Sequence, residues 1–207
     1  SVAIVDLTQG EMGTRGSKED RIREAKDSSK ILGISNRENL NLGDCFFEES
    51  KEELIKVIEQ VRRFKPNIVL CNAINDRHPD HGRAGALVSR ACYLSGLPKI
   101  KTLWNEKSQE SHRPTAVYHY IQDRWVDPDV IVDISDFFDD KLKVIKAFKS
   151  QFYDPLSTEP ATPISGEDFL NSIKARAIGL GRYIHTTYGE GFTAERYIGV
   201  NDLTTLL

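Results

Sequence analysis

A short segment in the middle of the chain carries the residues best suited to chemistry. It reads Asn75-Asp-Arg-His-Pro-Asp-His81, so that His78 and His81 stand three residues apart with Asp80 between them. Pro79 suits the first position of a helix, which would make His78 the cap and place Asp80 in the first turn, where the helix dipole favours a carboxylate. A cap does not need two histidines. One imidazole could therefore serve a metal and the other a substrate, and the residues alone leave this role and a structural one equally open.

A glycine-rich loop is the second segment whose residues could take part in chemistry. Glycines recur at positions 10, 13 and 16, directly after the apolar run 2–7. Backbone N–H groups in such loops can bind phosphate, but this spacing matches neither the dinucleotide-binding motif nor the P-loop. We favour a tight loop that faces a substrate, with Glu11 and Arg15 available to line it. A metal-free nucleotide- or phosphosugar-binding module or transferase that uses residues 10–16 is the alternative function.

The elements that must position these segments alternate between apolar runs and amphipathic stretches. We predict strands over residues 2–7, 38–42, 67–71, 115–121 and 129–134, and helices over 18–32, 51–64, 79–94, 136–148 and 166–185. Residues 96–113 are polar and aperiodic and 154–163 are rich in proline, so both are predicted to be loops. Alternating strands and helices predict an α/β fold, with a Rossmann-like, doubly wound and mostly parallel sheet.

Composition and charge narrow the class of partner. A chain of 207 residues is the length of one domain, and its formal net charge of −3 disfavours nucleic acid and anionic membrane surfaces. No apolar stretch approaches the roughly 20 residues of a membrane span, and the opening lacks the features of a signal peptide. The three cysteines have no C-x-x-C spacing and are expected to be reduced core residues. We expect a cytoplasmic protein with a small-molecule partner.

Three motifs together resemble the LmbE-like (PIG-L) family of zinc-dependent N-deacetylases: residues 78–81, residues 6–17 and the later Tyr188-Gly-Glu-Gly-Phe192. The resemblance runs over essentially the whole chain. It implies one deacetylase domain over residues 1–207 and a Zn²⁺ cofactor. It also implies hydrolysis of the acetamide of an N-acetylglucosaminyl small molecule, in particular N-acetylglucosaminyl malate of bacillithiol biosynthesis. Members of this family form hexamers, so the resemblance further implies a homo-oligomer.

The resemblance also assigns roles to individual residues. His81 matches a zinc ligand, and His78 matches the histidine that acts on the developing oxyanion or the leaving amine, oriented and charged by Asp80. Arg21 matches an arginine that contacts the substrate, and Glu11 lies in the loop expected to line it. Without the family, Arg21 would be interpreted as a solvated helix residue.

One family motif has no counterpart in residues 1–207. The other two zinc ligands and the general base of the family come from an Ala-His-Pro-Asp-Asp-like motif after its first strand, whereas the resemblance here begins at the second strand. We therefore expect this chain to lack the first strand and helix, on the order of 30 residues as in a βαβ unit. The remaining zinc ligands are expected in that segment. On this expectation the chain alone holds no complete zinc site, and residues 2–7 are short of a neighbouring strand.

Overall fold

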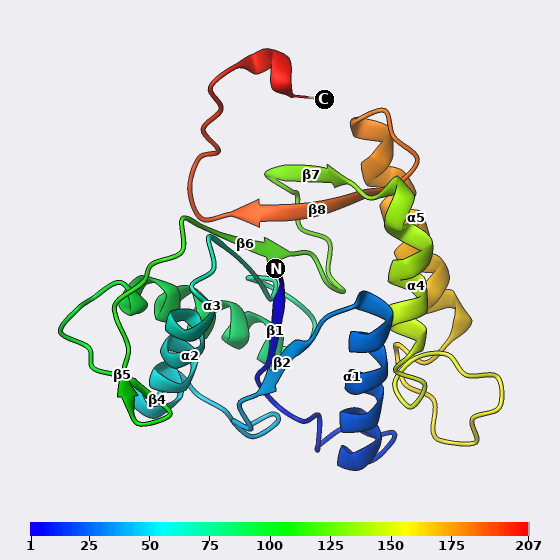
Figure 1. Cartoon of the computed structure of the whole chain (residues 1–207). Coiled ribbons are helices and arrows are strands. Elements are labelled where there is room, and N and C mark those ends of the chain that lie inside the picture. The colour runs from blue at the N-terminus through cyan, green and yellow to red at the C-terminus, as the bar shows by residue number, and fades with distance from the viewer. Residues whose placement is uncertain (207) are drawn as a thin grey trace. The chain divides into compact units, whose positions relative to one another are not determined.

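The computed structural model describes residues 1–206. They form two compact units: residues 1–44 with 131–190 make the first, and residues 45–130 with 191 onward make the second. Each unit is built from both helices and strands, which are labelled in Figure 1.

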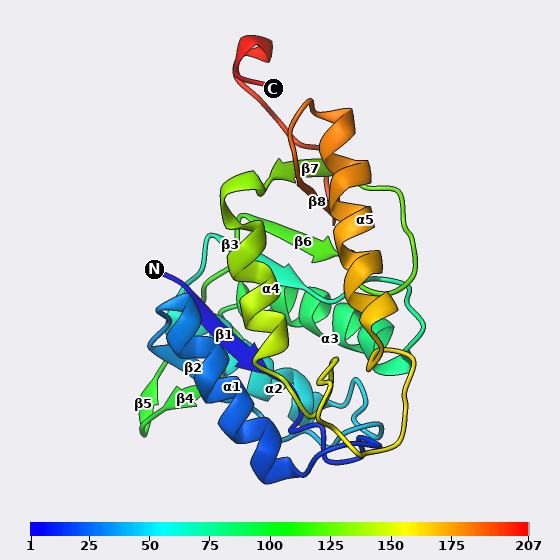
Figure 2. The ribbon, with the colours of Figure 1, turned by 90° about the vertical axis from the view of Figure 1, so that its right-hand side faces the viewer.

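The first unit contains a parallel strand pair and three helices. Strand β1 (Ala3–Asp6) pairs in parallel with β2 (Asn36–Asn39), and helix α1 (Lys18–Leu32) connects them. The short η1 (Ser135–Phe137) leads into α4 (Phe138–Lys146), and α5 (Glu167–Tyr183) follows. Figure 2 shows α1 and α4 side by side. The core of this unit centres on Ile134, Phe138 and Ala177, and the Phe138 ring stacks on Tyr188 at 4.0 Å.

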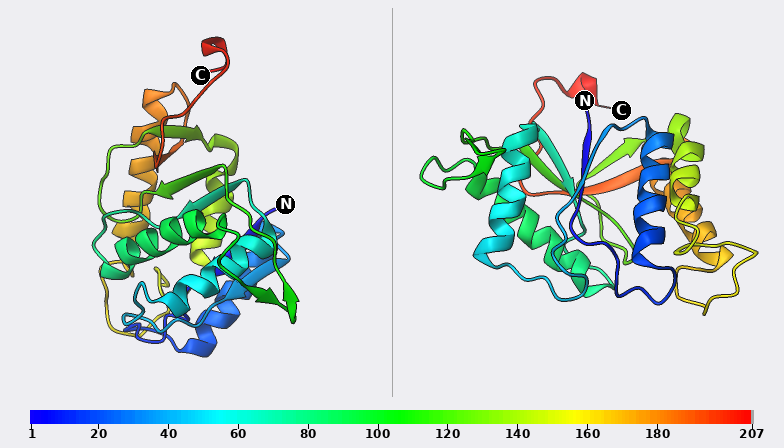
Figure 3. Two further views of the ribbon diagram at one scale, coloured as in Figure 1. Left: turned by 90° about the vertical axis from the view of Figure 1, so that its left-hand side faces the viewer. Right: turned by 60° about the horizontal axis from the view of Figure 1, so that its bottom comes forward.

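The second unit packs two helices beside a strand ladder. Its elements are α2 (Lys51–Phe64), β3 (Ile68–Cys71), α3 (Pro79–Ser95), β4 (Leu103–Trp104), β5 (Lys107–Ser108), β6 (Ala116–Tyr120) and η2 (Leu203–Thr205). Helices α2 and α3 pack against each other, with Ile58 and Leu87 almost fully buried, and the β4–β5 hairpin lies beside α2 (Figure 3). This packing positions α3, whose N-terminal residues carry the histidine motif.

The central ladder is mixed. Its order is β3-β6-β8-β7, which includes β7 (Val130–Asp133) and β8 (Gly189–Ala194). Strands β3 and β6 are parallel, and β8 runs antiparallel to β6. With β1–β2 also parallel, the prediction of an α/β fold with a mostly parallel sheet is confirmed.

Local sequence signals located most elements correctly. Helices 18–32 and 51–64 have the predicted bounds because Ser17 and Ser50 each begin a helix with a capping box, and the first helix ends at Gly33 in the left-handed conformation. The prediction of a loop over 96–113 is wrong in part, because β4 and β5 form a hairpin there. Its two turn residues, Asn105 and Glu106, both have positive φ.

The set of predicted strands needs two further corrections. Strand β8 was not expected, because its glycines hide any strand alternation, and the second strand covers residues 36–39 instead of 38–42. Among residues 1–206, β1 has one ladder partner, β2. The missing first strand and helix, and a single domain over residues 1–207, stay predictions. In the described part of the chain, no helix combines the length and apolar character needed to cross a bilayer.

Candidate active site

The start of α3 holds both histidines of the central motif. His78 is the N-cap residue, with φ −80° and ψ 124°, and Pro79 follows at the first helical position, as predicted. The His78 ring uses Nδ1 to accept the backbone N–H of Asp80 at 3.2 Å. Because Nδ1 acts as an acceptor, a neutral His78 carries its proton on Nε2. This nitrogen is therefore a hydrogen-bond donor.

His81 is bonded differently, through a carboxylate that the motif interpretation missed. Its Nδ1 is hydrogen-bonded to Oδ2 of Asp76, whose side chain is fully buried, while the His81 side chain remains 31% exposed. Burial alone would raise the pKa of Asp76, but the N–H of Arg124 and the His81 ring lower it more, so the net pKa lies below its usual value. The signal available in the sequence was an acidic residue in the loop between β3 and the helix cap.

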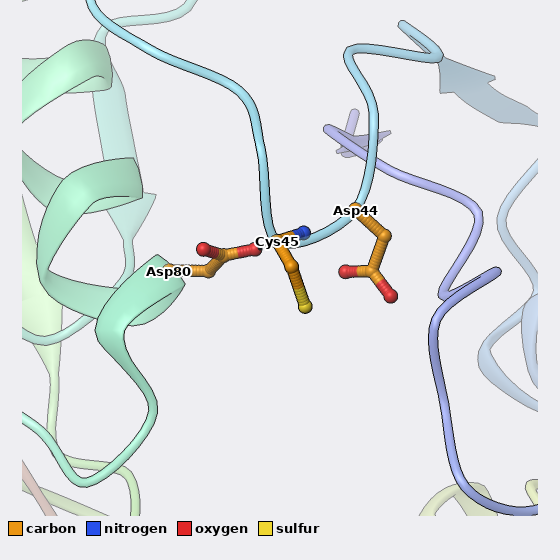
Figure 4. Close-up of side chains that lie close together, drawn as sticks. All are labelled: Asp44, Cys45 and Asp80. Carbon is orange, nitrogen blue, oxygen red and sulfur yellow. Dashed lines mark hydrogen bonds between the residues drawn. The ribbon is translucent and has the colours of Figure 1, made fainter.

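The Asp80 carboxylate, in contrast, is engaged away from the histidine rings. One oxygen accepts the backbone N–H of Cys45 at 2.9 Å, and the other accepts Nη1 of Arg83 at 2.7 Å. Figure 4 shows this carboxylate directed toward the Cys45 backbone. Its link to His78 runs through its own backbone N–H. None of these bonds joins the Asp80 carboxylate to the His78 ring, so the role of Asp80 in orienting His78 stays a prediction.

Cys45 is a further residue of a metal-binding type near this helix start. Its Sγ lies within 4.8 Å of an Asp80 carboxylate oxygen. Both oxygens of Asp80 already accept hydrogen bonds, and Cys45 is exposed, which corrects the expectation that all three cysteines are core residues. Cys71 and Cys92 are buried as expected. Nε2 of His81 is the ring nitrogen that Asp76 leaves free, and the role of His81 as a zinc ligand stays a prediction.

The predicted substrate residue Glu11 lies in the first unit, where it builds the glycine-rich loop. Its carboxylate accepts the backbone N–H of Asp44 at 2.8 Å and of Gln9 at 3.1 Å. Burial pushes the pKa of Glu11 upward, but these backbone donors outweigh it and the net pKa is lowered. In return, Asp44 accepts the N–H of Met12 at 3.0 Å. Glu11 thus holds the loop in shape, and its contact with a substrate stays a prediction.

Arg21 lies against the same loop. It is only 9% exposed, so the interpretation as a solvated helix residue is wrong. Its guanidinium donates to the Arg15 carbonyl at 3.0 Å and to Ser150 Oγ at 2.6 Å, and it pairs with Glu24 at 3.4 Å. A Cβ on Gly13 would lie 3.1 Å from the Gly10 carbonyl oxygen and 3.3 Å from Arg21 Nη2, so this position is tightly packed.

Several backbone N–H donors of this loop are already used. The N–H of Met12 binds Asp44 at 3.0 Å, that of Gly13 binds the Gly10 carbonyl at 3.1 Å, and that of Gly16 binds Glu159 at 2.7 Å. A phosphate-binding loop needs such groups directed at the ligand. The internal bonds therefore favour a loop folded around Arg21 over the phosphate-binding alternative.

The first unit also contains a cavity beside the glycine-rich loop. It measures about 480 Å³ and is lined by residues of α1, β2 and the loop, including Gly10 and Arg21. An ion pair between Arg37 and Asp6, with distances of 2.6 and 2.9 Å, lies in its wall. The volume falls in the range of small-molecule sites, about 300–1,000 Å³. The predicted substrate contact of Arg21 thus has a cavity of suitable size next to it.

Comparisons with known proteins identify the family. Residues 1–92, which include the histidine motif, match the family model PIG-L, GlcNAc-PI de-N-acetylase. The conserved protein TT1542 from Thermus thermophilus is 31% identical with a TM-score of 0.84, and the alignment covers 97% of this chain and 84% of that one. The chain therefore belongs to the PIG-L family, as the motifs indicated.

Two relatives carry a named activity. The diacetylchitobiose deacetylase of Thermococcus kodakarensis is 31% identical over 161 residues, which are 73% of this chain and 59% of the relative. The N,N'-diacetylchitobiose deacetylase of Pyrococcus horikoshii is 26% identical with a TM-score of 0.72, and the alignment covers 92% of this chain and 71% of that one. Both relatives are N-deacetylases of an N-acetylated sugar. The chain spans 59% of the length of the curated relative, so its own activity is a matter of proposal.

Proposed function

We propose that the protein is a zinc-dependent N-deacetylase that hydrolyses the acetamide of an N-acetylglucosaminyl small molecule. One observation carries this proposal. In a chain of the PIG-L family, the two histidines at the start of α3 have their Nδ1 atoms engaged, His81 by Asp76 and His78 by a backbone N–H. Both rings thereby keep Nε2 for a reaction partner.

Each histidine has a role that suits its bonds. His81 would hold the metal through Nε2, and its carboxylate partner on Nδ1 is the usual companion of a metal-binding imidazole. When bound, zinc supplies a Lewis acid for the amide carbonyl and lowers the pKa of a water molecule toward about 7. The Nε2–H of neutral His78 would donate a hydrogen bond to the oxyanion of the tetrahedral intermediate or to the departing amine, which takes up the proton released by the attacking water. Acetate and a free amino sugar are the products.

The remaining parts of the proposal rest on the family resemblance. It places two further zinc ligands and the general base in an Ala-His-Pro-Asp-Asp-like motif, which residues 1–207 do not contain. It assigns N-acetylglucosaminyl malate, the bacillithiol precursor, as the substrate. It assigns contact with that substrate to Arg21 and Glu11, and it assigns a homo-oligomer, in particular a hexamer, as the assembly. The alternative, a metal-free nucleotide- or phosphosugar-binding module or transferase, is less well supported because the N–H groups of Met12, Gly13 and Gly16 already bind other groups of the protein.

Acetate release tests the proposal. The protein expressed from its complete gene is assayed on N-acetylglucosaminyl malate, on diacetylchitobiose and on N-acetylglucosamine, and its zinc content is measured. We expect about one zinc per chain, loss of activity with a chelator and recovery with Zn²⁺. The variant His112→Ala is the control, because His112 binds the Pro66 carbonyl and should affect neither readout. Full activity without metal, or phosphosugar binding by a protein that releases no acetate, would contradict the proposal.

A further inference from the structure

The buried carboxylate of Asp76 is the feature of the candidate site that no motif assigned. Its Oδ1 accepts two backbone N–H groups, from Asp123 at 3.0 Å and from Arg124 at 2.7 Å. Its Oδ2 faces Nδ1 of His81, and none of the Asp76 side chain is exposed. The loop at 123–124 thus clamps the carboxylate, which cannot rotate without losing two hydrogen bonds.

This clamp determines where the proton of His81 lies. An ionised carboxylate only accepts hydrogen bonds, so the ring nitrogen that faces it must be the protonated one. A neutral His81 therefore carries its proton on Nδ1 and presents a lone pair at Nε2. The opposite holds three residues earlier, because Nδ1 of His78 accepts the N–H of Asp80 and the proton goes to Nε2.

We propose that Asp76 is a positioning residue that holds His81 in the tautomer able to bind a metal through Nε2, while the helix cap holds His78 in the opposite tautomer. The two neighbouring rings then present unlike groups, a lone pair from His81 and an N–H from His78. This inference rests on the proposed function, because it assumes that His81 binds zinc. The family resemblance gives roles to His78 and His81, and this inference adds Asp76 as the residue that makes the two rings chemically different.

The substitution Asp76→Asn tests this idea with little change in shape. The amide oxygen of the new side chain must still accept the N–H groups of residues 123 and 124, so its NH₂ group must face His81. An NH₂ group only donates, and Nδ1 of His81 would then have to become the acceptor. The ring proton moves to Nε2, which removes the lone pair that a metal needs. We expect zinc affinity to fall about 10–100-fold, as for other partners of metal-binding histidines.

Two measurements on the protein expressed from the complete gene test whether Asp76 sets the tautomer of His81. The first is the ¹⁵N NMR signature of the His81 ring in zinc-free protein, at a pH where the ring is neutral. The second is the dissociation constant for Zn²⁺. Asp129→Asn is the matched control, because Asp129 also accepts a backbone N–H, from Ala194 at 2.8 Å, without facing a histidine. It should leave both readouts unchanged.

The outcomes separate this inference from the proposed function. An Nδ1–H tautomer in the wild type that changes to Nε2–H in Asp76→Asn, with weaker zinc binding, supports the inference. An Nε2–H tautomer of His81 in the wild type overturns it, even if Asp76→Asn does not fold. Equal zinc affinity in both proteins also overturns it while leaving the deacetylase proposal intact. A wild type that binds no zinc contradicts the proposed function, and the tautomer of His81 still tests the positioning by Asp76.

Discussion

The imidazole rings of His78 and His81 lie with their centroids 5.2 Å apart and their planes tilted by 31°. Despite this proximity, their Nδ1 atoms make opposite hydrogen bonds: that of His78 accepts from the backbone, and that of His81 faces a carboxylate. Two residues of one type, one helical turn apart, are therefore prepared for different tasks. Substitutions at these two positions should have separable effects.

We predict that His81→Ala loses zinc together with deacetylase activity, whereas His78→Asn keeps zinc and loses rate. The loss of His81 removes a metal ligand. The loss of the His78 donor should lower kcat by about 10²–10³, as for one oxyanion-hole donor. Asparagine is chosen at position 78 because it still caps α3. Metal analysis and steady-state kinetics are the measurements, and unchanged zinc in His81→Ala would reverse the assigned roles.

Two glycines in the middle of helices should respond oppositely to alanine. A Cβ on Gly85 in α3 would lie 2.9 Å from the Asn72 carbonyl oxygen and 3.3 Å from that of Ala73, whereas a Cβ on Gly179 in α5 would have nothing within 4 Å. Alanine improves helix propensity by about 1 kcal/mol, but overpacking costs about 1–3 kcal/mol. We expect Gly85→Ala to destabilise the fold and Gly179→Ala to stabilise it by about 0.5–1 kcal/mol. Urea denaturation of both variants measures the difference, and equal midpoints would contradict the prediction.

Arg21 should matter for stability whether or not it contacts a substrate. Replacement by methionine would leave the buried carboxylate of Glu24 without its cation, and breaking a buried pair in this way costs about 3–5 kcal/mol. Arg23 in the same helix is its control, because its pair with Asp20 is largely exposed and screened by solvent, so that it should contribute little to stability. Free energies of unfolding for Arg21→Met and Arg23→Met test this. Similar values for the two would show that the Arg21 network is not stabilising.

The capping box of α1 predicts an unusually acidic carboxyl group. Hydrogen bonds from the Ser17 side chain and backbone, then from Arg23, lower the pKa of Asp20 from 3.8 to about 2. Because the folded-state pKa is the lower one, this stabilisation is complete above pH 3.8 and is lost as the pH falls through about 2. An NMR titration of the side-chain carboxyl checks the value.

Ser17→Ala is the complementary experiment. It should raise the pKa of Asp20 toward 3.8, because the largest cause of the lowered value is then removed. The pKa of Asp27, which is lowered by Lys30, should not respond and is the internal control. An Asp20 pKa near 3.8 in the wild type would mean that the capping box does not persist in solution.

The sequence predicted local features of the fold better than long-range ones. The bounds of α1 and α2 follow from Ser17, Ser50 and the apolar periodicity, which act within a few residues. Strand β8 could not be predicted, because its glycines carry no strand pattern and its register comes from pairing with β6, about 75 positions earlier in the chain. The two-residue strands β4 and β5 are too short for any periodicity.

The same division applies to the candidate site. The sequence by itself determined that His78, Asp80 and His81 share the start of one helix, because Pro79 and the spacing of three residues act locally. The bond of the His78 ring to the Asp80 N–H is equally local, and only the tertiary structure decided how the partner of His81 and the side chain of Arg21 are held. Asp76 is clamped by a loop 47 residues further along the chain, and Arg21 is buried by contact with Ser150. Such contacts depend on long-range packing that brings distant segments together, and no local pattern of residues encodes them.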